Sequence, residues 1–328
     1  MNGISVGILG TGKYVPDRRL TNQELEQMVE TNDEWIVTRT GIRERRIAAP
    51  EQATSDLAYE ASILALQAAG ITADELDLII VATITPDMFF PSTACLLQEK
   101  LGAKKAAAFD LSAACSGFIY GLANGTGLIA TGMYRHVLVV GAECLSRITD
   151  YTDRNTAILF GDGAGAVVLG QVPEGRGFKS FKLGADGAGG DLLRICGGGS
   201  RYPSTEQSVT DRRHFIEMNG RDVFKFAVRI MGSAAEEALA EAGLEKSDID
   251  LLIPHQANIR IIQSALERLD LPEEKAMINL DRYGNVSAGS IPIALAEAVE
   301  QNRVKEGDTL VLVGFGGGLT WGASVLVW

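Results

Sequence analysis

The sequence predicts an α/β protein, a layered α/β/α/β/α sandwich built from two copies of one unit. The first observation is that AGITADELDLIIVAT from Ala69 resembles AGLEKSDIDLLIPHQ from Ala242. The offset between these two segments also aligns VLVVGAE with LVLVGFG, and DLSAACSGFIYGLA with YGNVSAGSIPIALA, without a gap. One offset that holds across these segments indicates an internal duplication, which decides the fold.

The second observation is that each copy alternates strands and helices. Apolar runs such as LDLIIVAT are typical of buried strands, whereas DLAYEASILALQAAG has helical spacing and ends at Gly70. This alternation predicts mixed or largely parallel sheets with helices between the layers. We place the first half at residues 1–172 and the second half at 173–328, with VPEGRGF as the crossover between them.

Composition and charge exclude several classes of function. Hydrophobic residues make up 46% of the 328 and charged residues 22%, as in an ordinary soluble protein. The net charge is −12 and no basic block stands out, so we expect no nucleic-acid binding. The N-terminus does not resemble a secretory signal, and the apolar runs are too short to span a membrane. The four cysteines are widely spaced, which argues against zinc or disulfides and favours the cytoplasm.

Cys115 is the cysteine whose surroundings suggest chemistry. It lies between a strand-like and a helix-like segment, and Ala113, Ala114, Ser116 and Gly117 leave space around it. In the first turn of a helix the pKa of a thiol is expected to be lowered, which would favour a nucleophile. The alternative is that Cys115 is a small apolar filler, as most buried cysteines are.

The duplication predicts that two further residues lie near Cys115. His255 follows the apolar run DLLI and so lies at a strand end, and Asn285 precedes the helix that matches the Cys115 helix. Ligands bind at this edge of open α/β sheets, so the pseudo-twofold arrangement should form one cleft. A thiolate forms thioesters, and His and Asn can donate hydrogen bonds to an oxyanion. Taken singly, His255 can instead cap a strand and Asn285 can be a turn residue.

Other motifs are less specific. GILGTGK resembles a phosphate-binding loop, but Tyr14 replaces the required Ser or Thr and Pro16 prevents a helix, so we reject it. GFGGGLTWGA precedes a strand rather than a helix, although its glycines allow backbone N–H groups to approach a ligand. Trp35, Arg39 and Arg154 are either ordinary surface residues or a site for an adenine and phosphates.

A set of motifs indicates a known family. The chain contains, in order, TNDEWIVTRTGIRER, AACSGF, PHQANIRI, YGNVSAGS and GFGGGLTWG. Together they resemble the β-ketoacyl-[acyl-carrier-protein] synthase III family, the initiating condensing enzymes of type II fatty-acid synthesis, which have a thiolase-like fold. The resemblance covers essentially the whole chain. It implies a decarboxylative Claisen condensation of an acyl-CoA primer with malonyl-acyl-carrier protein, without a metal or other cofactor.

The resemblance also implies roles for individual residues. Cys115 would be the acylated nucleophile, and His255 and Asn285 would support decarboxylation of the malonyl unit. The N–H groups of Cys115 and Gly317 would form the oxyanion hole. The remaining matches are Thr31, Trp35, Arg39 and Arg154 for coenzyme A, Lys225 and Arg260 for the acidic carrier protein, and Phe90 for the acyl pocket of a partner subunit, which implies a homodimer.

Three alternatives remain open on sequence grounds. One is a condensing enzyme of secondary metabolism with the same fold and a different acyl donor or acceptor. Another is a cysteine hydrolase, since papain-like proteases also use Cys, His and Asn, but AACSGF lacks the surroundings of their cysteine. The third is a binding protein with an inactive cleft, against which the intact Cys, His and Asn argue. The length of the acyl primer depends on the shape of the pocket, which these motifs do not describe.

Overall fold

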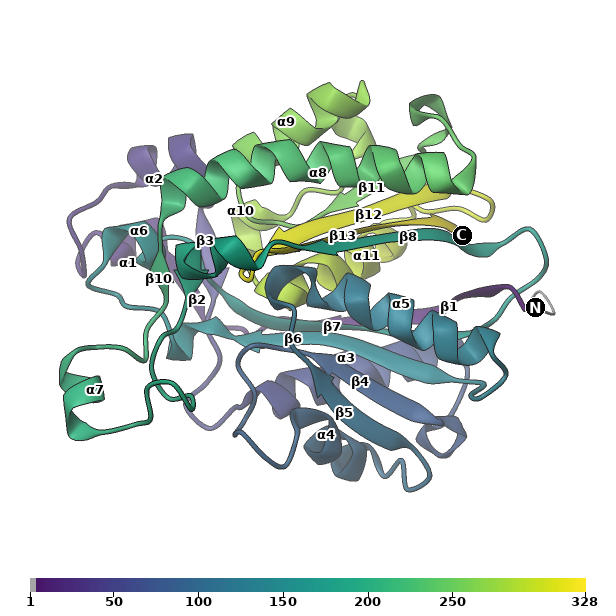
Figure 1. Ribbon diagram of the computed structural model, residues 1–328, viewed down its shortest axis with the longest axis horizontal. Coiled ribbons are helices and arrows are strands. Elements are labelled where there is room, and N and C mark those ends of the chain that lie inside the picture. The colour runs from purple at the N-terminus through teal and green to yellow at the C-terminus, as the bar shows by residue number, and fades with distance from the viewer. Residues whose placement is uncertain (1–3) are drawn as a thin grey trace.

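Two β-sheets form the centre of the structure, a computed structural model that describes residues 4–328 (Figure 1). The first sheet contains, in spatial order, β1 (Val6–Tyr14), β7 (Asp162–Gln171), β6 (Val137–Cys144), β4 (Leu78–Ala82) and β5 (Ala107–Leu111). The second contains β11 (Leu251–Pro254), β12 (Thr309–Gly316), β13 (Thr320–Val327) and β8 (Gly177–Ala185). Both sheets combine parallel and antiparallel pairs, as predicted.

Three layers of helices enclose and separate the sheets, which confirms the predicted α/β/α/β/α sandwich (Figure 1). Across the molecule these layers contain α8 (Gly220–Ala242) with α9 (Ile259–Leu269), then α5 (Gly117–Ala130) with α11 (Ser290–Glu300), then α3 (Thr54–Ala69) with α4 (Thr93–Leu101). Separate hydrophobic cores fill the spaces between layers. Nearly all of α11 is buried because it packs between the two sheets.

The duplication appears in the register of the strands. β4 pairs in parallel with β6, so that Leu78 lies opposite Val137, and β11 pairs in parallel with β12, so that Leu251 lies opposite Leu310. The offset found in the sequence matches Leu78 with Leu251 and Val137 with Leu310, so the two pairs are equivalent. The first sheet continues beyond β4 to β5, whereas the second has only an isolated bridge at the corresponding edge. The copies therefore differ most at this edge.

Helix ends follow the same repeat. α3 ends at Gly70, as predicted, with a left-handed φ of 68°, and α8 ends at Gly243 with a φ of 70°. Glycine adopts this conformation without the steric cost that a Cβ would add. The predicted boundary after residue 172 lies in the turn between β7 and β8, and the division into two units at this place stays a prediction.

Short elements cover one end of the sandwich, at the left of Figure 1. The buried Arg45 connects several of them, because its guanidinium donates hydrogen bonds to Leu20 O, Asn22 Oδ1 and Ile158 O. Burial lowers the pKa of Arg45 to about 10, and these acceptors compensate for the lost hydration. The elements are β2 (Arg19–Thr21), α1 (Asn22–Leu25), α2 (Asp33–Thr40), β3 (Glu44–Arg46), α6 (Arg154–Ala157), β9 (Leu193–Arg194), α7 (Glu206–Thr210), β10 (Glu217–Met218) and α10 (Leu280–Tyr283).

Within residues 4–328, no helix combines the length and the apolar character needed to cross a bilayer. All four cysteines are free thiols. The same residues contain no group of three or more His, Cys, Asp or Glu side chains arranged to hold a metal ion.

Candidate active site

Cys115 lies in a tight turn between β5 and α5, where the sequence predicts it. Ala114 before it has a left-handed φ of 47°, and the Ser116 hydroxyl after it donates to Ala113 O at 2.8 Å. The Thr320 hydroxyl, on β13, donates to the same oxygen at 2.9 Å. The turn that carries the thiol is therefore attached to the second sheet, although it belongs to the first half of the chain.

Glycines on β12 allow three segments to meet at this place. A Cβ built on Gly316 would lie 2.5 Å from Cys115 N, closer than atoms can approach. A Cβ on Gly314 would lie 3.4 Å from the Cβ of His255 and 3.5 Å from Cys115 O. The backbone of β12 thus passes between the Cys115 turn and His255, and glycine is required at Gly316 for that approach.

The ionisation of the Cys115 thiol differs from the sequence-based expectation. The residue is only 7% exposed, and burial raises the pKa of its thiol to about 12, with a smaller increase from the Glu143 carboxyl. The expected lowering by the helix N-terminus is therefore outweighed, because the thiolate loses its hydration. A thiol with this pKa is protonated at neutral pH, so a role as a nucleophile would require a group that accepts its proton.

His255 follows β11 directly and is 1% exposed. Its backbone N–H donates to Val313 O at 2.8 Å, and its ring packs edge-on against Phe315 with the centroids 5.8 Å apart. Burial lowers the pKa of the imidazole to about 3, so the ring is neutral near pH 7. A neutral imidazole can donate one hydrogen bond to a ligand.

Asn285 is held by its backbone and by one side-chain atom. Its N–H donates to Leu159 O at 2.8 Å, and its carbonyl accepts from Gly161 N at 3.0 Å. The side-chain Oδ1 accepts from Ser287 N at 2.8 Å. A backbone N–H requires an acceptor, so this contact identifies Oδ1 and leaves the two Nδ2 protons for another partner.

The structure brings Cys115, His255 and Asn285 to one cavity of about 100 Å³, where the sequence predicts them together. This cavity adjoins two larger ones. It shares Cys115, Phe160 and Leu193 with an apolar cavity, and it shares Phe224, Asn258 and other residues with a cavity lined by basic side chains. The three residues therefore lie at the junction between an apolar and a basic compartment.

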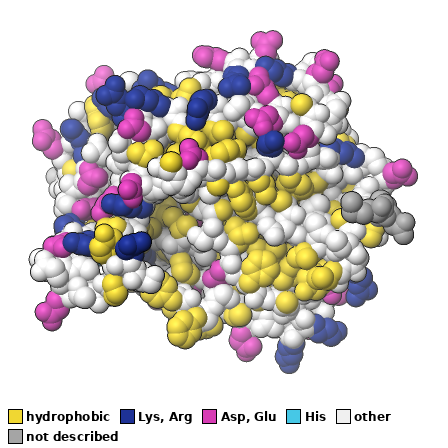
Figure 2. All heavy atoms as spheres, viewed as in Figure 1, with side chains coloured by type: hydrophobic (Ala, Val, Ile, Leu, Met, Phe, Trp, Pro, Cys, Tyr) yellow, Lys and Arg dark blue, Asp and Glu magenta, His cyan; other side chains and the backbone are white. Residues whose placement is uncertain are grey.

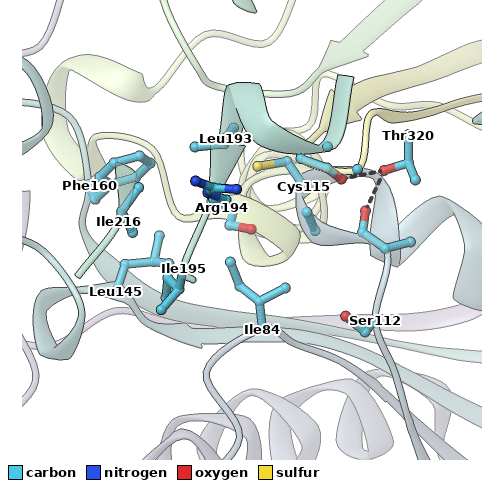
Figure 3. A pocket seen from close by; sticks show the side chains of 16 residues that line it. Ile84, Ser112, Cys115, Leu145, Phe160, Leu193, Arg194, Ile195, Ile216 and Thr320 are labelled. Carbon is cyan, nitrogen blue, oxygen red and sulfur yellow. Dashed lines mark hydrogen bonds between the residues drawn. The ribbon is translucent and has the colours of Figure 1, made fainter. Parts of the chain in front are cut away.

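The apolar cavity begins at the Cys115 sulfur (Figure 3). Its volume is about 430 Å³, and Gly317 lines it together with Cys115. Arg194 adds one charged side chain, which is ion-paired with Glu217 at 3.0 Å. An acyl chain attached to the sulfur would find an apolar environment there. The large apolar side chains that line it are Ile84, Leu145, Phe160, Leu193, Ile195 and Ile216.

The basic cavity, of about 680 Å³, contains Trp35 and Arg39. The guanidinium groups of Arg39 and Arg154 lie over the Trp35 ring, at 4.8 and 4.9 Å from its centroid. Arg154 does not line the cavity itself, and it reaches the ring from α6. Thr31 lies before α2 and has a buried hydroxyl without a hydrogen-bond partner among the described residues. Arg39 and Arg154 of the predicted coenzyme residues therefore meet on the Trp35 ring, and no contact of Thr31 with that ring is established.

Lys225 and Arg260 line the same basic cavity, on α8 and α9 respectively. The Lys225 ammonium pairs with Asp222 at 3.1 Å, and the Arg260 guanidinium lies 5.2 Å from the centroid of the Phe224 ring. Figure 2 shows Lys and Arg side chains along the edge of the molecule formed by α8 and α9. The acidic chain thus has a local basic area beside the cavity.

Phe90 lies apart from these cavities. It is 85% exposed, and Phe89 and Met88 beside it are exposed as well. None of the three lines the apolar cavity at Cys115. The predicted role of Phe90, in the pocket of a partner subunit, is not tested by a single chain and stays a prediction.

Sequence reasoning missed several residues around the site. Glu143 and Ser287 lie near the Cys115 thiol, and Arg194, Arg221 and Asn258 line the cavities. Ser287 was visible as the last residue of G-N-x-S, although no role was attached to it. Glu143 and Gly316 are matched by the sequence offset, so the repeat placed a carboxyl and a glycine at equivalent positions of β6 and β12. A charged residue at a position where the other copy has glycine, within an otherwise apolar strand, is the sequence signal that points to Glu143.

Comparisons with known proteins agree with this geometry. Residues 109–187 match the family model described as 3-oxoacyl-[acyl-carrier-protein] synthase III, and residues 239–328 match the model of its C-terminal part. The β-ketoacyl-[acyl-carrier-protein] synthase III of Desulfitobacterium hafniense (strain Y51) is 60% identical over 325 residues, which cover 99% of this chain and 98% of that protein.

Solved structures give the same result. The synthase III from Thermus thermophilus superposes with a TM-score of 0.92 and 52% identity, covering 98% of this chain and 99% of that one. The priming β-ketosynthase of the R1128 polyketide pathway also has a TM-score of 0.92, at 37% identity over 99% of this chain and 96% of its own. On the full-length identity and the shared architecture, the chain belongs to the β-ketoacyl-[acyl-carrier-protein] synthase III family.

Proposed function

We propose that the protein condenses an acyl-CoA primer with malonyl-acyl-carrier protein, with loss of CO₂, to give a β-ketoacyl-acyl-carrier protein. The observation that carries this proposal is the position of Cys115, His255 and Asn285 at the junction of an apolar and a basic cavity. Family membership supports it. The 60% identity to a synthase III, against 37% to a polyketide priming enzyme, favours fatty-acid synthesis over secondary metabolism.

In the first half-reaction Cys115 attacks the thioester carbonyl of the primer. The acyl group passes to the sulfur, coenzyme A leaves, and the acyl chain occupies the apolar cavity. The N–H groups of Cys115 and Gly317 are the proposed donors to the oxyanion of the tetrahedral adduct. Such preorganised donors typically account for about 10²–10³ in rate each.

In the second half-reaction malonyl-acyl-carrier protein loses CO₂ and its enolate attacks the acyl-enzyme. The negative charge develops on the thioester oxygen, where neutral His255 and the Nδ2 of Asn285 would each donate a hydrogen bond. The low pKa of His255 suits this role, because a neutral ring donates without titrating near pH 7. Asn285 suits it because Oδ1 is already bound to Ser287 N.

The proposed substrate contacts lie around the basic cavity. Trp35 with Arg39 and Arg154 would hold the adenine and phosphates of coenzyme A, with Thr31 beside them. Lys225 and Arg260 would receive the acidic carrier protein. For the homodimer we propose that Phe90 enters the acyl cavity of the second subunit. The hydrophobic area around α5 and β5 in Figure 2 would supply contact surface.

The test is mass spectrometry of the intact protein after incubation with acetyl-, branched- and longer-chain acyl-CoAs. We expect one acyl group per chain, on Cys115, and none on the Cys115→Ala variant. Cys95→Ala is the matched control, because Cys95 is exposed and lies outside all three cavities, and it should acylate like the wild type. Adding malonyl-acyl-carrier protein should then release CO₂ and the condensed product. Acylation of Cys115→Ala, or peptide hydrolysis without CO₂ release, would overturn the proposal.

A further inference from the structure

A buried carboxyl near Cys115 has no part in the mechanism above. Glu143, on β6, is 0% exposed. Charged side chains are rarely buried unless other groups hold them, because the carboxylate loses its hydration. The side chain is held by the segment that follows β4, through Thr83, Ile84 and Thr85.

The hydrogen bonds of Glu143 are unevenly divided between its two oxygens. Oε2 accepts from Thr83 Oγ1 at 3.1 Å, from Thr85 Oγ1 at 2.5 Å, and from the N–H groups of Ile84 and Thr85 at 3.2 and 3.1 Å. Oε1 receives only a second, longer contact from Ile84 N at 3.3 Å. A proton on this carboxyl therefore belongs on Oε1, because Oε2 already faces four donors.

The two threonine hydroxyls are fixed as donors. Thr83 Oγ1 accepts from Thr85 N at 3.0 Å, and Thr85 Oγ1 accepts from Cys144 N at 2.9 Å. With those lone pairs occupied by backbone donors, each hydroxyl proton is free to point at Glu143. These contacts hold the carboxyl group in one orientation and leave Oε1 with only the longer contact from Ile84 N.

Ser287 links this carboxyl to the thiol. Its side chain is buried, its hydroxyl has no hydrogen bond of good geometry among residues 4–328, and it lines the apolar cavity with Cys115. The turn that carries Ser287 packs directly on β6, because a Cβ built on Gly141 would lie 2.1 Å from Ala288 O, and it also approaches the helix after Cys115, where a Cβ built on Gly117 would lie 3.8 Å from the Cβ of Ala288. In agreement with this placement, the Ser287 hydroxyl lowers the pKa of the Cys115 thiol and that of the Glu143 carboxyl. The Ser287 N–H bond to Asn285 Oδ1 fixes the position of its turn.

We propose that Ser287 and Glu143 remove the thiol proton when Cys115 is acylated. The Cys115 proton passes to the Ser287 oxygen, while the Ser287 proton passes to Oε1 of Glu143. As the proton leaves, the sulfur bonds to the carbonyl carbon of the primer. The carbon–sulfur bond to coenzyme A then breaks, so that the coenzyme leaves as a thiolate and takes a proton from solvent. Glu143 later returns its proton to solvent. This step rests on the proposed function, in which Cys115 is the acylated residue.

Because the pKa of the Cys115 thiol is about 12 and that of the Glu143 carboxyl about 7, the proton transfer is uphill and proceeds together with the attack of the sulfur on the thioester. Burial raises the pKa of Glu143 to about 7, which makes it a stronger base than an ordinary carboxylate. His255, with a pKa of about 3, is a much weaker base and is free for its hydrogen-bonding role. The titratable groups that respond to the charge of Glu143 are the thiols of Cys115 and Cys144, and both pKa values are raised by it.

The experiment compares single-turnover acylation by acyl-CoA in Glu143→Gln, Ser287→Ala and the wild type, between pH 5.5 and 9. General-base assistance is typically worth about 10²–10⁴ in rate, so each variant should acylate at least tenfold more slowly near pH 7.5. The wild-type rate should level off above the ionisation of Glu143, whereas the variants should keep rising with pH. Ser62→Ala, which removes a buried hydroxyl on α3, is the control and should behave like the wild type.

A merely electrostatic or structural role predicts the opposite result. Glu143 raises the pKa of the thiol, so Glu143→Gln would then give faster acylation and faster alkylation by iodoacetamide. If either variant acylates as fast as the wild type or faster, the proton relay is wrong. The proposed function still holds in that case, provided that Cys115 of the wild type is acylated. Absence of Cys115 acylation in the wild type overturns both. Matching melting temperatures would show that slow acylation is not a folding defect, and Glu143→Asp, which keeps a carboxyl, should recover part of the rate.

Discussion

The turns before α5 and α11 occupy the same place in the two halves of the molecule and have nearly the same backbone. Ala114 has a φ of 47°, and Ser287, its equivalent in the second copy, has a φ of 46°. Both are left-handed conformations that cost a non-glycine residue energy, so their preservation in both copies points to a shared geometric requirement. The first turn carries the Cys115 thiol, whereas the second carries the amide of Asn285 and the hydroxyl of Ser287.

The strands that face these turns differ in a complementary way. β12 presents Gly316 to the Cys115 turn, where any side chain would collide with Cys115 N. β6 presents Glu143, at the equivalent position, close to Ser287. Gly141 and Gly314 remain glycine in both copies, and a Cβ on Gly141 would lie 2.1 Å from Ala288 O. The two turns and the strands that face them thus share one backbone arrangement and differ in a few side chains, which would have different roles in the proposed function.

The largest effect should come from the amide of the second turn. Asn285→Ala removes a proposed donor to the enolate, so malonyl decarboxylation and condensation should fall by about 10²–10³. Acylation of Cys115 should remain much closer to the wild-type rate, because the thiol and its oxyanion donors lie elsewhere. The measurement is release of labelled CO₂ beside single-turnover acylation. Equal losses in both half-reactions would contradict this division between the turns.

A second variant separates chemistry from the shape of the turn. Asn285→Asp keeps an oxygen that can accept from Ser287 N, but it has no proton to donate to the enolate. It should therefore lose decarboxylation as fully as Asn285→Ala. Decarboxylation that survives in Asn285→Asp would show that the turn, rather than the amide donor, is what matters.

From the sequence, the strands and helices that the two copies have in common were easier to predict than the side chains in which the copies differ. The repeat located the strands, the helices and the strand ends of His255 and Cys115, because each has a local pattern. It did not predict the ionisation of Cys115, since burial depends on packing from both sheets. In the sequence Glu143 is only one polar residue in an apolar strand. Its partners Thr83 and Thr85 lie in a loop far away along the chain, so no local motif predicts that the three residues meet.

A smaller effect should follow from removing the glycine that distinguishes β12. Gly316→Ala places a methyl group against Cys115 N, and overpacking of this kind costs about 1–3 kcal/mol. A shift of the thiol by about 1 Å can cost up to 10²-fold in rate, so we expect acylation to fall at least tenfold. Calorimetry and single-turnover acylation measure the two effects.

The matched control for Gly316→Ala is another glycine on an element that touches the same turn. Gly127, in α5, has open space where its Cβ would be. Gly127→Ala should leave acylation unchanged and stabilise the helix by up to about 1 kcal/mol. If Gly316→Ala behaved like Gly127→Ala, the close approach of β12 to the thiol-bearing turn would not be a constraint on the site.

The last prediction concerns the buried titratable groups His255 and Glu143, and its effect appears in the pH dependence of stability rather than in rate. His255 has a pKa of about 3 when folded and 6.5 when unfolded, so below pH 6.5 the unfolded chain gains a proton and the free energy of unfolding falls. Glu143 has a pKa of about 7 when folded and 4.5 when unfolded, so its contribution is lost as the pH rises from 4.5 to 7. Each slope is about 1.4 kcal/mol per pH unit, with opposite signs, so the two cancel between pH 4.5 and 6.5.

Removing His255 and removing Glu143 should therefore change the pH dependence of the free energy of unfolding in opposite directions. Relative to the wild type, His255→Gln should lose stability as the pH rises from 4.5 to 6.5, since only the Glu143 slope remains. Glu143→Gln should gain stability over the same range, since only the His255 slope remains. Urea unfolding of the three proteins at four or five pH values measures the free energy of unfolding of each variant relative to the wild type. Titrations that are common to all three proteins cancel in these differences. Variant profiles that run parallel to the wild type would show that these two groups do not titrate with the shifted pKa values that their burial implies.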